Sequence, residues 1–176
     1  MPDPTDTPAT DKLYLADAYL TEFTAVVVGV DDEGGRVALD RTAFYATGGG
    51  QPHDTGELSW DGGAVAVPVV EVRSAGPVVW HRLDEGAALP AIGSEVAGTI
   101  DWDRRHQLMR THTAMHLLCG VIWNEYGTAV TGGNMETLSW WLDFKFDPLP
   151  DGFAARIEEL VNAEIANDRP IEVTFL

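Results

Sequence analysis

The sequence predicts an α+β fold, in which a small β-barrel or sandwich is followed by a region that mixes helices with strands. Two different residue patterns along the 176 residues support this prediction. Short β-branched runs separated by Gly and Pro turns fill residues 13–100, and such spacing is typical of small barrels and sandwiches. From Asp103 onward, apolar residues recur at helical spacing instead. We therefore expect one β domain over 13–100 and the N-terminal part of a second, α+β domain over 101–176.

The first domain should begin near Leu13, because residues 1–12 contain three prolines, several polar side chains and little to bury. We interpret these twelve residues as a disordered lead-in. The turn over residues 31–35 separates the first two expected strands at hairpin distance. The expected strands of this domain are residues 23–30, 36–40, 64–72, 78–83 and 95–100.

The second domain should contain a helix over 103–126, a strand over 137–146 and an amphipathic helix over 153–167. A further strand begins at Ile171, and the sequence stops five residues later, at Leu176. A chain that ends at an apolar residue inside a strand suggests a fragment of a longer protein. We therefore expect the second domain to be incomplete.

The charge of the chain bears on its partners. Asp and Glu number 28 against 11 Lys and Arg, which gives a net charge of −17. Such a charge repels a phosphate backbone and argues weakly against a nucleic-acid partner. An acidic proteome in a cell with high internal salt is an equally good explanation, because the screening length falls to about 3 Å at 1 M. Charge therefore does not exclude a nucleic-acid partner.

The cysteine content and the hydropathy exclude several classes of protein. Cys119 is the only cysteine, so an intramolecular disulfide and a four-cysteine zinc site are both excluded. No apolar run approaches the roughly 20 residues that cross a bilayer. The N-terminus lacks the basic start and apolar stretch of a signal peptide. These observations predict a soluble, cytoplasmic protein that does not bind membranes.

The first motif that indicates chemistry is the pair His112 and His116. Imidazoles at i and i+4 project from the same side of a helix, a spacing that suits two positions around a tetrahedral Zn²⁺. The alternative is one core histidine and one surface histidine. Cys119 lies three residues further on and is a speculative third ligand, although a small buried apolar role suits it better.

The second motif is the run Gly48-Gly49-Gly50, which lies between Thr42 and Gln51. Glycine lets the backbone adopt positive φ and approach another group closely. A flexible hairpin loop is the simpler interpretation, but hydrogen-bonding side chains and aromatic residues surround the glycines. No Gly-Lys-Ser/Thr sequence follows, so this is not a phosphate loop.

Together, in this order and spacing, the two motifs resemble the alanyl-tRNA synthetase editing domain. The resemblance is carried by Asp40–Gly56 and Arg105–Leu118, and it is greatest to the free-standing editing proteins of the AlaX type. Residues 141–144 resemble the family's Arg-hydrophobic-Asp-Phe strand, with Trp141 in place of the usual arginine. The resemblance extends from about Leu13 to the end of the chain.

This resemblance implies a β-barrel of the translation-protein type followed by the α+β editing core that alanyl- and threonyl-tRNA synthetases share. It implies a trans-editing hydrolase that removes serine, and often glycine, from mischarged alanine tRNA. That tRNA would be the partner; the oligomeric state is left open. Zn²⁺ would be the cofactor, held by His112, His116 and a downstream Cys-x-x-x-His motif.

The resemblance also implies functional roles for the residues of the glycine loop. Gly48, Gly49 and Gly50 would reach over the site, and Thr42 and Gln51 would recognise the amino-acid moiety and act as catalytic residues. Zinc with an open position could activate water and polarise the ester carbonyl. A site that hydrogen-bonds the serine hydroxyl would strongly reject alanine. We expect the rings of the histidine pair to converge, and Gln51 or Thr42 to lie near them.

The sequence departs from the family pattern, because no cysteine follows Cys119 and no histidine follows His116. The Cys-x-x-x-His half of the metal site is therefore absent, and we expect the isolated chain to be nearly inactive. Alternatives are a metal-free editing domain that uses Thr42 and ordered water, another zinc hydrolase, or a non-catalytic tRNA-binding or interaction module with a lost metal site.

Overall fold

The computed structural model describes residues 7–171, and the chain divides into two compact units, residues 1–108 and 109–176. The boundary lies at Leu108 rather than at residue 100. The reason is that the start of the following helix packs with the first unit, where Arg105 and Leu108 are both buried. Each unit is described separately below. No helix within residues 7–171 is long and apolar enough to cross a membrane.

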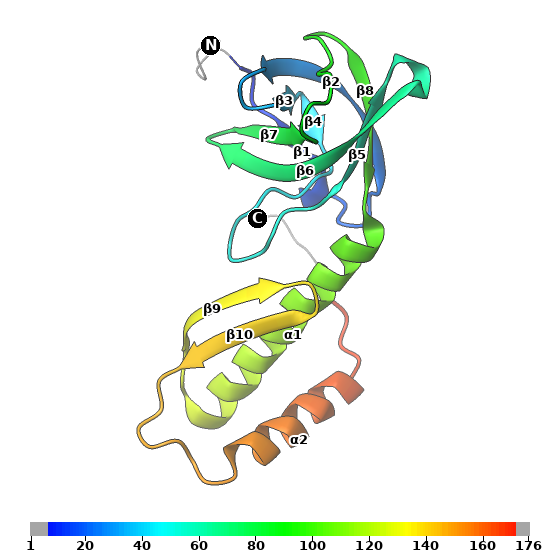
Figure 1. Ribbon diagram of the computed structural model, residues 1–176. Helices are drawn as coiled ribbons and strands as arrows, with labels where there is room; N and C mark the ends of the chain where they lie inside the picture. The colour runs from blue at the N-terminus through cyan, green and yellow to red at the C-terminus, as the bar shows by residue number, and fades with distance from the viewer. Residues whose placement is uncertain (1–6, 172–176) are drawn as a thin grey trace. The chain divides into compact units, whose positions relative to one another are not determined.

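The first unit is a closed barrel of six antiparallel strands (Figure 1). The strands follow one another around the barrel in the order β2-β3-β7-β6-β5-β8. Their bounds are β2 (Glu22–Asp31), β3 (Arg36–Leu39), β5 (Gly56–Trp60), β6 (Val65–Ala75), β7 (Val78–Leu83) and β8 (Glu95–Ile100). This confirms the predicted barrel rather than a sandwich. We did not predict β5, because only Leu58 and Trp60 in this short strand are apolar.

Alternation along the strands places the core inside the barrel. In β8 exposed and buried residues alternate without a break, and β2 shows the same pattern over most of its length. Side chains of a strand point alternately to its two faces, so this pattern buries one face and exposes the other. The innermost apolar side chains are Val27, Val37, Leu39, Phe44, Leu58, Val69, Val72, Val79 and Leu83.

The N-terminal segment corrects one expectation, because residues 10–12 are not a disordered lead-in. The short strands β1 (Asp11–Lys12) and β4 (Arg41–Thr42) pair in parallel. The buried Thr10 hydroxyl donates to the Leu39 carbonyl at 2.9 Å and accepts the Val79 N–H at 3.0 Å. Order therefore begins before Leu13, because these hydrogen bonds hold a segment with few apolar side chains. Residues 1–6 lie outside the described range.

The second unit packs two helices against a two-stranded antiparallel hairpin (Figure 1). Its elements are α1 (Trp102–Tyr126), which begins in the first unit, β9 (Val130–Glu136), β10 (Ser139–Phe144) and α2 (Phe153–Ala166). The two predicted helices and the strand over 137–146 are confirmed. The core of the unit contains Val121, Ile122 and Ile157. We did not predict β9, where two consecutive glycines weaken the strand signal. The strand expected from Ile171 lies almost entirely outside the described residues.

Two 3₁₀ turns, η1 (Leu13–Leu15) and η2 (Asp61–Gly63), complete the first unit. Together, the barrel and the helix-hairpin unit confirm the predicted α+β class.

Candidate active site

The glycine run forms a tight turn at the tip of the loop between β4 and β5. The Gln51 N–H donates to the Gly48 carbonyl at 3.0 Å, and the Gly48 N–H donates back to the Gln51 carbonyl at 3.2 Å. The two central residues have positive φ, +58° at Gly49 and +80° at Gly50, as a type I′ turn requires. A Cβ added at either glycine would meet no atom within 4 Å. The turn therefore needs glycine for its conformation and not for space.

A buried ion pair closes the base of this loop. Asp54 is fully buried and receives the Tyr45 N–H at 2.6 Å on its Oδ2. The Arg105 Nε lies 2.9 Å from both Asp54 carboxylate oxygens, and the Arg105 guanidinium also donates to the Ala43 carbonyl. One side chain from the first turns of α1 thus holds both ends of the loop.

Sequence reasoning gave no role to Asp54 or Arg105, although both lie within the motifs that carry the resemblance. Both residues stand among polar neighbours, Asp54 in Gln51–Glu57 and Arg105 in Asp101–Gln107, so the local sequence gave no sign of their burial. Charged residues are almost never fully buried unless they are paired. Their pairing across 51 residues could not be predicted from local pattern.

Thr42 is also fully buried, at the start of the same loop. Its Oγ1 lies 2.8 Å from His81 Nε2 and accepts the Phe44 N–H at 3.1 Å. Burial lowers the pKa of His81 to about 4, although its hydrogen bond to the Val37 carbonyl opposes this shift. The imidazole is therefore neutral near pH 7.

The neutral His81 ring determines which way the Thr42 hydrogen bond runs. Since the Val37 carbonyl can only accept, the Nδ1 that lies 3.3 Å away carries the proton. His81 Nε2 is then the acceptor, and the Thr42 hydroxyl donates to it. Thr42 therefore has its donor and one acceptor position occupied, and a substrate could reach its hydroxyl only if neighbouring residues moved.

Gln51 is 7% exposed and lies in the barrel unit together with Thr42 and the three glycines. The histidine pair lies in the second unit. The expected proximity between the loop residues and the histidines therefore concerns two units and stays a prediction.

His112 and His116 lie on the same side of α1, as their spacing predicts. Their rings are stacked with centroids 4.8 Å apart and planes 25° from parallel. Burial, and then the neighbouring His116, lowers the pKa of His112. Cys119 is partly buried, and burial raises the pKa of its thiol.

These residues do not make a complete metal site. Within residues 7–171 no three His, Cys, Asp or Glu side chains come together in a group that could hold a metal ion. A catalytic zinc normally takes three protein ligands, and the pair supplies two. The donor set in the described part of the chain therefore fits half of the implied site, and Cys119 does not complete it.

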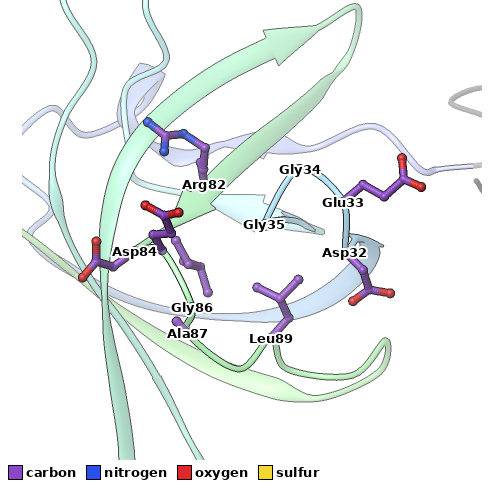
Figure 2. A pocket seen from close by; sticks show the side chains of 11 residues that line it. Asp32, Glu33, Gly34, Gly35, Arg82, Asp84, Gly86, Ala87 and Leu89 are labelled. Carbon is purple, nitrogen blue, oxygen red and sulfur yellow. The ribbon is translucent and has the colours of Figure 1, made fainter.

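The barrel also has a pocket of about 420 Å³, which Figure 2 shows between the β2–β3 turn and the segment after β7. Asp32, Glu33, Asp84 and Glu85 line it together with Arg82. Acidic side chains predominate, so the pocket is unsuited to a phosphate group. It shares no residue with the glycine loop or the histidine pair, and we do not assign it to the site.

Comparison with known proteins identifies the family. Residues 12–104 match the model of the class II (A) tRNA synthetases. The chain is 41% identical over 174 residues to the alanine–tRNA ligase of Pyrobaculum aerophilum, a match that covers 97% of the chain and 19% of the ligase. It is 38% identical over 168 residues to the alanyl-tRNA editing protein AlaX-M of Methanosarcina acetivorans, which covers 93% of the chain and 68% of that protein. The chain belongs to the alanyl-tRNA synthetase editing-domain family.

A second AlaX-M protein, from Saccharolobus solfataricus, is 38% identical over 95% of the chain and 69% of its own length. The chain thus spans 19% of the ligase and about two thirds of the AlaX-M relatives. The family-model match ends before the histidine motif, whereas the AlaX-M matches extend over nearly the whole chain. Membership in the editing-domain family confirms the resemblance that the two motifs indicated. Trp141, which replaces an arginine in that resemblance, is exposed on β10.

Proposed function

We propose that this chain takes part in alanyl-tRNA editing as a hydrolase that deacylates alanine tRNA mischarged with serine or glycine. The similarity to the alanyl-tRNA editing proteins AlaX-M along nearly the whole chain carries the proposal. The buried Asp54–Arg105 pair supports it, since it connects the glycine loop of the first motif to the helix that carries the second motif.

The Thr42 hydroxyl is the group that would distinguish serine from alanine. It donates to His81 and accepts from the Phe44 N–H, which leaves one acceptor position free. A serine hydroxyl can donate to that position once the neighbouring residues move aside, whereas the alanine methyl group cannot. A site that hydrogen-bonds the serine hydroxyl would reject alanine strongly, because bound alanine would leave a buried polar group unpaired. Gln51, anchored in the glycine turn, would orient the amino-acid moiety.

We further propose that His112 and His116 are two ligands of a Zn²⁺ whose other ligands lie outside residues 7–171. The stacked arrangement of the rings on one helix face supports this role. The described residues alone do not complete the site, so we derive no step of the reaction through the metal.

Deacylation assays test the proposal. The 176-residue chain, and a longer chain in which a Cys-x-x-x-His segment follows Leu176, are incubated with alanine tRNA carrying serine, glycine or alanine. We expect the longer chain to release serine, to release little alanine, and to lose activity on His116→Ala. Both low and high salt are needed, because a net charge of −17 opposes tRNA binding at low ionic strength. No release of serine by either chain at either salt contradicts the proposal.

A non-catalytic tRNA-binding module is the second candidate. It is favoured by the lack of a three-ligand cluster within residues 7–171. This candidate predicts that both chains bind alanine tRNA without releasing the amino acid, and that neither retains zinc after dialysis. Strong deacylation by the 176-residue chain that a chelator does not affect would instead favour a metal-free reaction with Thr42 and water.

A further inference from the structure

Three aromatic side chains pack against one another on the surface of the barrel unit. Trp102 at the start of α1 and His106 one turn later have ring centroids 5.3 Å apart and planes 13° from parallel. Tyr19 packs against Trp102 in a tilted arrangement, with ring centroids 5.4 Å apart and planes 43° from parallel. Tyr19 is 67% exposed, and His106 is exposed as well. We call these three residues the aromatic stack.

Hydrogen bonds of residues 17–19 and of Arg105 hold the backbone around the aromatic stack in place. The Tyr19 N–H donates to Asp17 Oδ1 at 2.8 Å, and the carbonyl of Ala18 accepts Arg105 Nη1 at 2.9 Å. Arg105 lies on α1 between the other two members of the stack. The buried guanidinium therefore fixes the tyrosine segment and the helix relative to each other, and a ligand would not have to order them first.

The same anchors hold the glycine loop. Arg105 binds Asp54 at the base of that loop, and the neighbouring Arg104 Nε donates to the His53 carbonyl at 3.2 Å. Arg105 thus contacts both the tyrosine segment and the base of the loop that would contact the amino-acid moiety.

We propose that the aromatic stack is a platform for an unpaired base of the single-stranded 3′ end of tRNA, an inference that rests on the proposed function. Unpaired bases of RNA stack on aromatic side chains, and every base has a face that can do so. Asp17, Asp101 and Asp103 are exposed and close to Tyr19 or Trp102 in the sequence, and their negative charges oppose the approach of a phosphate backbone. An acidic protein can bind RNA by stacking bases on these ring faces, and salt does not screen this interaction as it screens contacts with phosphate.

The test is the binding of a single-stranded RNA oligonucleotide ending in CCA to the 176-residue chain, at about 0.1 M and about 1 M salt. We expect Tyr19→Leu and His106→Leu each to weaken binding by at least about five-fold at both salt concentrations. His106→Phe, which keeps a flat ring, should restore binding. Trp123→Leu is the matched control, because it removes another exposed aromatic side chain, 57% exposed against 67% for Tyr19, from the second unit. A blunt RNA duplex should not compete.

Unchanged affinity in both leucine variants, or equal competition by the duplex, overturns the platform and leaves the proposed deacylase standing. RNA binding that Tyr19→Leu abolishes, with no deacylation by the longer chain, supports the platform and overturns the deacylase. If neither the oligonucleotide nor alanine tRNA binds at any salt concentration, the platform and the proposed function are both wrong.

Discussion

At the scale of single residues, the Asp54–Arg105 pair should dominate the stability of the barrel unit. Removing one partner leaves an uncompensated buried charge, so we expect Arg105→Leu to lower the free energy of unfolding by about 3–5 kcal/mol. Arg73→Leu is the control, since the Arg73–Glu71 pair is exposed and should contribute no more than about 1 kcal/mol. Urea denaturation measures both variants. Equal losses in the two would contradict the structural role of the buried pair.

His81 should make stability depend on pH. Its pKa falls from the ordinary 6.5 to about 4 in the folded state, so the unfolded chain binds more protons between these values. The free energy of unfolding should therefore decrease as pH drops from 6.5 to 4, by about 3 kcal/mol in total. Because carboxylates also titrate in this range, the measurement compares wild type with His81→Gln, which does not titrate. The inference fails if the two proteins show the same pH dependence.

At the scale of elements, the glycine turn should be needed for activity and not for folding. A valine at Gly49 must adopt a φ near +58°, which costs about 1–3 kcal/mol. Gly76→Val in the β6–β7 hairpin is a matched control, because Gly76 has a φ of +60° and equally open surroundings. Both variants of the longer chain should fold with similar losses of stability, and deacylation should disappear only in Gly49→Val. Retained deacylation in Gly49→Val would show that the loop is only a connector.

At the scale of the whole molecule, metal content should follow ligand number. In the 176-residue chain the pair His112 and His116 supplies two ligands, so we expect less than one zinc per chain after dialysis. The longer chain with a Cys-x-x-x-His segment should retain about one zinc, and His116→Ala should lose it. Atomic absorption measures all three proteins. One tightly held zinc in the 176-residue chain would show that other residues complete the site.

The sequence by itself determined the features that depend on near neighbours. Short β-branched runs bounded by Gly and Pro turns predicted five of the six barrel strands. Helical spacing predicted α1 and placed His112 and His116 on one side of it, and the glycine run predicted a turn with positive φ. These features follow from the geometry of the backbone within a few residues, so no fold was needed to predict them.

Only the tertiary structure decided which distant polar groups meet. Thr42 pairs with His81 across 39 residues, Asp54 with Arg105 across 51, and Thr10 with Val79 across 69. Closing the barrel brings these groups into an apolar interior, where each must find a partner because an unpaired buried polar group is costly. The sequence contains the donors and acceptors, but their pairing depends on strand order and register, which the closed barrel sets over the whole unit.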